Sequence, residues 1–213
     1  MIDFAAIRGL KAALMAMLVA TSGAARAGDA PALCATPDQV KQVQTYYAAS
    51  PGAMPAIASR MLKLPDALIA SALPADQAYG TSGAAFIRVW ESLMAWDSPV
   101  VIVIKSGNVI EIRGRIPKGE PSKISNYFNV DEKGEGMSGH LRPDLMTTIY
   151  AVELPTKTAN APLRGVLFFD AAGETVFGVY AAGESERGPA PPALLGQFEK
   201  TRALIRSMPK LCP

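Results

Sequence analysis

Apolar residues recur at helical spacing through the first half of the chain. Thr36-Pro37-Asp38-Gln39 combines an N-cap threonine, a proline at the first helical position and a capping-box glutamine, which predicts a helix start. Breaks at Ser50-Pro51-Gly52 and Leu64-Pro65-Asp66 separate this helix from two shorter ones, which end before Pro74. The most regular amphipathic pattern lies within residues 86–94, where these apolar residues share one helix face: Phe86, Val89, Trp90, Leu93 and Met94.

From residue 99 the pattern becomes that of β-strands. The β-branched run Val100–Ile104 predicts a buried strand, and Lys105-Ser-Gly-Asn108 predicts a hairpin turn into a strand over residues 109–112. Alternating or apolar runs predict further strands, over residues 127–130, 148–154, 166–169 and 176–180. Polar, glycine-rich loops are expected over residues 131–139 and 183–192. A closing helix follows, with these leucines and phenylalanine facing inward: Leu194, Leu195, Phe198 and Leu204.

Strands joined by hairpins, with helices before and after them, indicate an α+β fold. The expected architecture is an antiparallel β-sheet with an N-terminal helical part and a C-terminal helix. The chain shows no internal repeat and no linker between domains, so we expect one domain over residues 28–213.

Residues 1–27 have the pattern of a secretory signal peptide. Arg8 and Lys11 precede an apolar run over residues 12–20, and Ala25-Arg26-Ala27 offers small residues for cleavage after Ala27. The alternative is a membrane anchor, which needs about 20 apolar residues, more than this interrupted stretch provides. We therefore expect cleavage, a periplasmic or secreted mature protein and no stable membrane insertion after cleavage.

Cys34 and Cys212 are the two cysteines of the chain. They are too far apart for a CxxC redox pair, and they lack the histidine partners of a zinc site. An even number of cysteines in an exported protein favours pairing, so we expect a disulfide between Cys34 and Cys212. The alternative is two unrelated free thiols.

Charge argues against nucleic acid as a partner. The chain has 21 basic and 19 acidic residues, and removal of residues 1–27 leaves 18 of each. A neutral mature protein has no overall field to attract nucleic acid or anionic lipid. Residues 57–69 resemble a helix-turn-helix in their spacing, but residues 65–74 contain no Lys or Arg to contact phosphates.

No catalytic motif stands out. The chain contains one histidine and lacks GxSxG, GxGxxG and P-loop patterns, and its carboxylates are scattered. The histidine, His140, is either a structural or exposed residue or a ligand. Glycines around it would let the backbone approach a flat ligand closely, and Met137 offers a thioether three residues away.

Several short motifs occur along the chain, and their order and spacing are informative when taken together. They are Ser50-Pro-Gly, Ala70-Ser-Ala-Leu-Pro74, Phe86-Ile-Arg-Val-Trp90, Gly114-Arg-Ile-Pro-Lys-Gly119, Tyr127-Phe-Asn129, Met137-Ser-Gly-His140 and Phe168-Phe-Asp-Ala-Ala-Gly-Glu174. With these motifs, residues 47–205 resemble the haem-utilisation carriers of the HutX/ChuX type, which are related to HemS-like haem proteins.

The resemblance implies a homodimeric α+β protein that binds haem and passes it on in haem-iron utilisation, and not an enzyme. His140 matches one family histidine near the ligand, which makes it the expected main ligand to the haem iron. The family's other histidine position holds Ile104, beside Lys105, and the usual basic cluster reads Glu184-Ser-Glu-Arg-Gly188. If the site has been rebuilt, Tyr127, Met137 or Lys105 is the alternative ligand.

Two other functions stay open at this point. One is a non-haem periplasmic binding or structural module that retains the fold, since a fold does not fix a function. The other is a haem-degrading enzyme. Titration with haem tests the first alternative, and product analysis with a reductant tests the second.

Overall fold

The computed structural model describes residues 33–131, 137–157, 162–183 and 188–212. The expected signal peptide, residues 1–27, lies outside the described residues. So do residues 132–136 of the predicted glycine-rich loop and residues 184–187 of the altered basic cluster.

The N-terminal part forms three helices, as the sequence predicts: α1 (Pro37–Ala49), α2 (Pro55–Leu62) and α3 (Asp66–Ser71). The start of α1 has the predicted capping box. The Thr36 side chain accepts a hydrogen bond from the Gln39 backbone N–H, and the Gln39 side chain accepts one from the Thr36 N–H. Two orphan amide groups of the first turn are thereby satisfied.

Six antiparallel strands form the main sheet in the order β1-β7-β8-β9-β2-β3. Their bounds are β1 (Ala78–Ser82), β2 (Val100–Lys105), β3 (Asn108–Arg113), β7 (Met146–Leu154), β8 (Leu163–Asp170) and β9 (Thr175–Tyr180). The hairpins predicted at β2–β3 and β8–β9 are confirmed, and so is the α+β fold class.

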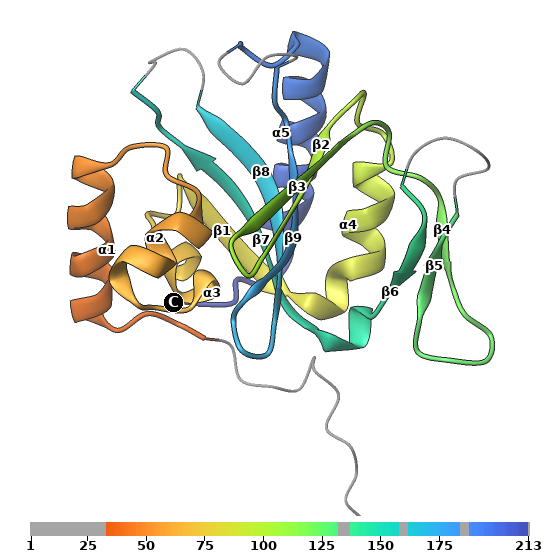
Figure 1. The fold of residues 1–213 in the computed structure, drawn as a ribbon, viewed down its shortest axis with the longest axis horizontal. Coiled ribbons are helices and arrows are strands. Elements are labelled where there is room, and N and C mark those ends of the chain that lie inside the picture. Colours follow the sequence, from red (N-terminus) through yellow and green to blue (C-terminus); the bar gives the residue numbers. More distant parts are fainter. Residues whose placement is uncertain (1–32, 132–136, 158–161, 184–187, 213) are drawn as a thin grey trace, which may run out of the picture.

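Helices cover both faces of the main sheet (Figure 1). Along β7, Ile149 and Ala151 pack into a core with α4 (Phe86–Leu93) and α5 (Pro192–Arg206). The alternating residues Tyr150 and Val152 pack into a second core with α1 and α3. Because side chains of a strand alternate between faces, burial of both faces makes β7 apolar along most of its length.

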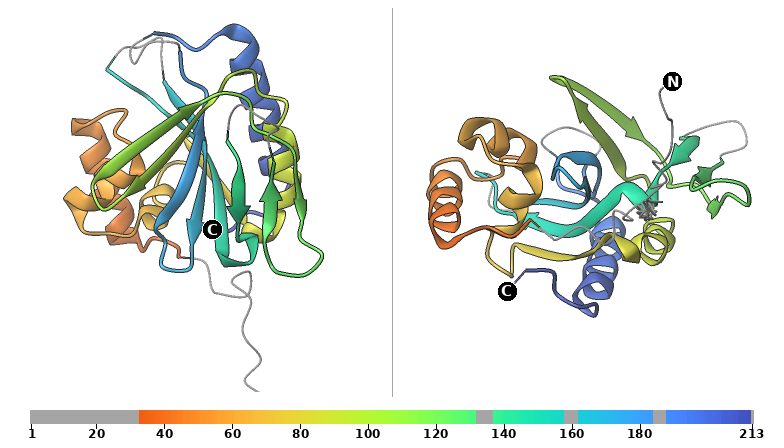
Figure 2. Two further views of the ribbon diagram at one scale, coloured as in Figure 1. Left: turned by 45° about the vertical axis from the view of Figure 1, so that its right-hand side comes forward. Right: turned by 90° about the horizontal axis from the view of Figure 1, so that it is seen from below.

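A second sheet of three short antiparallel strands lies beyond α4 (Figure 2). It consists of β4 (Gly119–Pro121), β5 (Phe128–Val130) and β6 (Gly139–Leu141), with β5 in the middle. The Phe128 ring lies 5.2 Å from the Phe86 ring and 5.7 Å from the Trp90 ring, centroid to centroid. The Trp90 ring also contacts the Phe177 ring of β9, with centroids 6.3 Å apart. Helix α4 therefore joins the small sheet to the main sheet.

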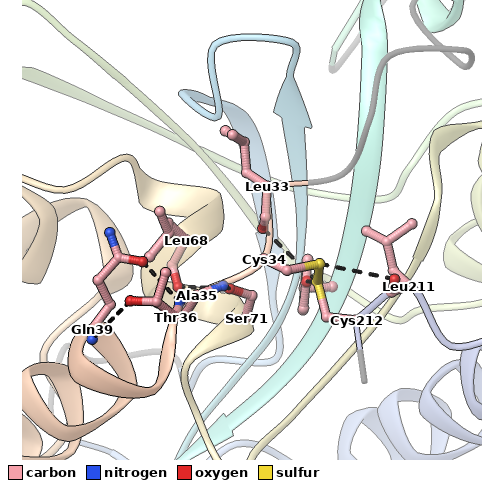
Figure 3. Close-up of a disulfide and its surroundings, with 10 residues drawn as sticks. Leu33, Cys34, Ala35, Thr36, Gln39, Leu68, Ser71, Leu211 and Cys212 are labelled. Carbon is pink, nitrogen blue, oxygen red and sulfur yellow. Dashed lines mark hydrogen bonds between the residues drawn. A yellow bond between two sulfur atoms is a disulfide. The ribbon is translucent and has the colours of Figure 1, made fainter.

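Cys34 and Cys212 form a disulfide, as expected, with their Cα atoms 5.6 Å apart (Figure 3). The bond joins the segment before α1 to the segment after α5. Beside it, Ala35 N–H donates to Ser71 Oγ at 3.0 Å, and Leu211 N–H donates to Gly80 O of β1 at 3.0 Å. The two ends of the described chain are thus held against α3 and β1.

Within the described residues, the helices are all too short or too polar to cross a bilayer.

Candidate functional site

His140 lies in a row of polar residues that crosses the small sheet. The strand register places His140 of β6 directly opposite Asn129 of β5, and Asn129 directly opposite Glu120 of β4. The neighbouring residues Phe128 and Val130 point the other way, into the core against α4. Alternation along β5 therefore places Asn129 and His140 on the face of the small sheet that is turned away from the core.

Two residues of the β5 segment contact the imidazole of His140. The Nδ1 atom of His140 lies 2.9 Å from Oδ1 of Asn129, within hydrogen-bond distance. The Tyr127 ring packs edge-on against the imidazole, with ring centroids 5.7 Å apart and planes inclined by 61°. The His140 side chain is otherwise exposed.

Tyr127 is itself held by a charged pair. Arg142 donates two hydrogen bonds to the carboxylate of Asp144, both 2.7 Å long, and its guanidinium lies 5.5 Å from the centre of the Tyr127 ring. Asn126 donates a further bond of 3.2 Å to the same carboxylate. The hydrogen bonds from Arg142 hold the pKa of Asp144 below its usual range, so the carboxylate stays charged.

Two glycines allow the strands to take this arrangement. Gly139, immediately before His140, has a φ of +150°, in the region that favours glycine over residues with a Cβ. In β4, a Cβ added to Gly119 would come within 2.1 Å of the Phe128 ring. Only glycine at this position lets β4 pair closely with β5.

A cavity of about 890 Å³ opens beside these strands. Most of the side chains around it are polar, and Val130 is buried toward the core. The lining residues are Lys118, Gly119, Glu120, Asn129, Val130, Asp131, Ser138, Gly139 and His140.

The structure brings together two of the four residues proposed from the sequence, His140 and Tyr127. Met137 is partly buried and packs against the core formed with α4 and α5. Lys105 lies elsewhere, beside Ile104 in a separate cavity of about 490 Å³ between α2, the β2–β3 turn and the β8–β9 turn. Its ammonium donates to Glu174 at 2.7 Å, an ion pair that raises the pKa of Lys105. Within this chain, Lys105 and His140 therefore do not share a site.

Sequence reasoning missed Asn129 as a site residue. The signal was present in the predicted strand, where polar Tyr127 and Asn129 alternate with apolar Phe128 and Val130. It placed Asn129 on the outer face, but pairing with β6 could not be anticipated, because β6 falls where the sequence predicts the end of a loop.

Comparison with protein families and curated proteins gives two matches. The family model described as haem utilisation ChuX/HutX matches residues 81–200, more than half of the chain. The intracellular heme transport protein HutX of Vibrio cholerae serotype O1 is 25% identical over 159 residues, which is 75% of this chain and 80% of HutX.

Solved structures show the same fold. A crystal structure of ChuX superposes with a TM-score of 0.66 at 21% identity, over 78% of this chain and 98% of ChuX. The E. coli heme oxygenase ChuS superposes with a TM-score of 0.62 at 17% identity, over 78% of this chain and 48% of ChuS. At these identities the similarity concerns the fold alone.

The comparison with HutX contradicts the periplasmic or secreted location expected from residues 1–27. HutX is described as intracellular, so that expectation is wrong. It depended on a few cations, an alanine-rich apolar run and a small-residue triplet, a composition that is not specific to secretory signals. The pairing of Cys34 with Cys212 was predicted from the same expected export, but it is confirmed independently, since the two sulfurs are bonded in the structure.

Proposed function

Because the chain belongs to the haem utilisation ChuX/HutX family, we propose that it binds haem and carries it to another protein in haem-iron utilisation. The observation that carries the proposal is the setting of His140. It is the single histidine of the chain, and it lies at the wall of the 890 Å³ cavity with one ring nitrogen in a hydrogen bond to Asn129. Its other ring nitrogen forms no hydrogen bond recorded among the described residues.

The donors present fit haem iron better than a bare metal ion. Imidazole is a common axial ligand of haem, and the porphyrin itself supplies the four equatorial nitrogens. The described residues include no group of three or more His, Cys, Asp or Glu side chains that could hold a metal ion by themselves. The cavity volume lies within the range of about 300–1,000 Å³ that is typical of cofactor and ligand sites.

In this proposal each residue of the site has a separate task. His140 is the main protein ligand to iron, and Tyr127 supports its ring from the side. Lys118 supplies positive charge at the cavity wall, where the porphyrin carboxylates would be attracted, whereas Glu120 and Asp131 repel them. Haem supplies a large apolar surface and an iron that accepts the imidazole.

The alternative ligands proposed from the sequence are less available. The ammonium of Lys105 is held by Glu174 in the separate cavity, and Met137 is packed against the core. Tyr127 stands next to His140 and packs edge-on against its imidazole, so it supports the histidine from the side. Among the described candidates, His140 is therefore favoured.

A second function, a non-haem binding module with the same fold, is favoured by one observation. Ile104, which cannot coordinate iron, stands where the family's other histidine is expected. A haem-degrading activity has less support, because the similarity to ChuS concerns the fold alone.

Titration of the purified protein with hemin tests the proposal. A haem carrier should give a sharp Soret band that saturates at a fixed stoichiometry, whereas a non-haem module should leave the spectrum of free hemin unchanged. Incubation of the loaded protein with a reductant and oxygen then separates a carrier from an enzyme. A carrier should return intact haem, and release of an open-chain tetrapyrrole would identify haem degradation.

A further inference from the structure

The geometry points to a positioning role for Asn129: we propose that its side-chain oxygen fixes His140 as the tautomer with a proton on Nδ1 and a free lone pair on Nε2. The effect of this tautomer on iron binding rests on the proposed haem function. The tautomer itself is a property of the protein without haem, so the two can be tested separately.

The chemistry of the two groups determines which atom carries the proton. The Oδ1 atom of an asparagine can accept hydrogen bonds but cannot donate one. Because Nδ1 of His140 lies 2.9 Å from this oxygen, the bond requires a proton on Nδ1. A neutral imidazole carries one N–H, so Nε2 is left with the lone pair that a metal needs.

The pairing of β5 with β6 holds Asn129 and His140 side by side. Asn129 and His140 are direct partners in the β5–β6 ladder, and β5 is the central strand of the small sheet. Phe128 and Val130, on either side of Asn129, are buried and hold β5 against α4. A shift of register by one residue would turn Asn129 and His140 to opposite faces, so the core packing also preserves the hydrogen bond.

A second contact limits the rotation of the imidazole. Tyr127 lies two residues before Asn129 on the same face and packs edge-on against the ring of His140. The ring is therefore held at Nδ1 by Asn129 and along its side by Tyr127. Groups that orient a ligating histidine in this way typically change metal affinity by 10–100-fold when they are removed.

NMR of the haem-free protein tests the tautomer directly. The chain has one histidine, so long-range ¹H–¹⁵N correlations from an imidazole belong to His140 without further assignment. The measurement is made in the alkaline range where the ¹⁵N shifts of the ring no longer change with pH, so that the neutral imidazole is observed. We expect Nδ1 to be protonated and Nε2 to be bare in the wild-type protein.

Three variants separate the hydrogen bond from general effects on structure. Asn129→Leu removes the acceptor and should give a mixture of tautomers, whereas Asn129→Asp keeps an acceptor and should retain the proton on Nδ1. Asn108→Leu is the matched control, because the Asn108 side chain donates to the backbone oxygen of Lys105 at the β2–β3 turn, away from the His140 site. Far-UV circular dichroism checks that each variant is folded. A wild-type ring with its proton on Nε2, or an unchanged tautomer in Asn129→Leu, would overturn the proposal.

Hemin titration of the same variants tests the consequence for iron. Asn129→Leu should bind hemin about 10-fold more weakly than wild type, the lower end of the range for such groups, and Asn108→Leu should bind as wild type. Equal affinity of wild type and Asn129→Leu would overturn the role of Asn129 toward iron. If wild type fails to bind hemin while its Nδ1 is protonated, the proposed function is wrong and the placement of the proton by Asn129 still holds.

Discussion

The position of His140 in the β5–β6 ladder determines which side chains surround it. Asn129 faces it directly across the strands, and Tyr127 approaches it from the diagonal position. Arg142 and Asp144, in the segment after β6, hold Tyr127 in turn. A histidine that would otherwise be a free surface residue is thereby held in a defined orientation.

Three buried tyrosines make a prediction for the stability of the protein at high pH. Burial raises the pKa of Tyr150 to about 12, and it also raises the pKa of Tyr47 and of Tyr180. Unfolded tyrosines ionise near pH 10, so above that pH the unfolded state releases protons that the folded state retains. The stabilising contribution is complete below pH 10 and is lost as the pH rises through the folded-state values.

We therefore expect the free energy of unfolding to fall steadily above about pH 10. Urea denaturation at a series of pH values measures it, and the tyrosinate absorbance of the native protein reports the pKa values independently. The variant Tyr150→Phe should show a weaker decrease than wild type. A free energy of unfolding that stays constant to pH 12 would contradict the burial of these hydroxyl groups.

Among the elements, those with long apolar patterns and the short strand β5 could be predicted from the sequence, whereas the strands β1, β4 and β6 could not. The helices of the N-terminal part and the hairpins β2–β3 and β8–β9 follow directly from the apolar spacing and the turn residues. Strands β4 and β6 each begin with glycine, which is uncommon in strands, and lack the aromatic and polar alternation of residues 127–130. The sequence predicts no strand over Ala78–Ser82, where β1 forms, because the pairing of this AYGTS segment with β7 over a long sequence distance decides its structure.

The same contrast, between local patterns and pairing over long sequence distances, explains how much of the site could be predicted. His140 and Tyr127 were identified individually, and their contact depends on the β5–β6 pairing that the sequence does not show. Lys105 was proposed as an alternative ligand because it stands beside Ile104, at the family's other histidine position. In the fold, however, it lies at the end of β2 beside the β8–β9 turn, where Glu174 pairs with it.

Helix α4 offers a test of how the small sheet is attached. The indole N–H of Trp90 donates to the backbone oxygen of Pro117 at 3.1 Å, just before β4, and both groups are buried. In Trp90→Phe the buried oxygen loses its partner, which typically costs about 1–3 kcal/mol, in addition to the loss of packing against Phe128 and Phe177. We expect a decrease of this size or larger in the free energy of unfolding.

Urea denaturation of Trp90→Phe measures this decrease, with Ile124→Ala as the control. The Ile124 side chain is 97% exposed, so its truncation should change stability by no more than about 0.5 kcal/mol. A Trp90→Phe variant as stable as the control would show that the indole does not hold the small sheet.

At the scale of the whole molecule, the disulfide links the two ends of the described chain. It joins residues 178 positions apart, and in the chain-entropy model a loop of this length stabilises the folded state by about 5 kcal/mol. The double variant Cys34→Ser/Cys212→Ser should lower the free energy of unfolding by up to that amount while α1 and β1 keep their other contacts. Two thiols that react with an alkylating reagent in the native, unreduced protein would contradict the bond.

The edges of the main sheet suggest how two molecules could associate, and we propose a homodimer formed through β3. The edge strand β1 is covered by the C-terminal segment, through the bond from Leu211 N–H to Gly80 O. The opposite edge strand, β3, projects from the body of the molecule (Figure 2), and its Val109 and Ile110 side chains are 53% and 56% exposed. An open apolar edge of this kind favours pairing with a second strand.

A charge at this edge should prevent the association. Light scattering should show a dimer for the wild-type protein and a monomer for Ile110→Lys, because lysine on an edge strand opposes strand pairing. Ile124→Lys, in the loop between β4 and β5, places the same charge on an exposed residue away from β3 and should remain dimeric. A wild-type monomer over the micromolar range would contradict the homodimer.

The central claim, that His140 binds haem iron in this member of the ChuX/HutX family, is tested most directly by hemin titration of wild type and His140→Ala. The iron–imidazole bond should add to the affinity that burial of the porphyrin supplies, so loss of His140 should weaken binding. The account predicts a saturable Soret band for wild type, and a shifted band with affinity lower by about 10-fold or more for a folded His140→Ala. Equal affinity and an unchanged spectrum in the two proteins would show that His140 is a structural residue and that the iron ligand lies elsewhere.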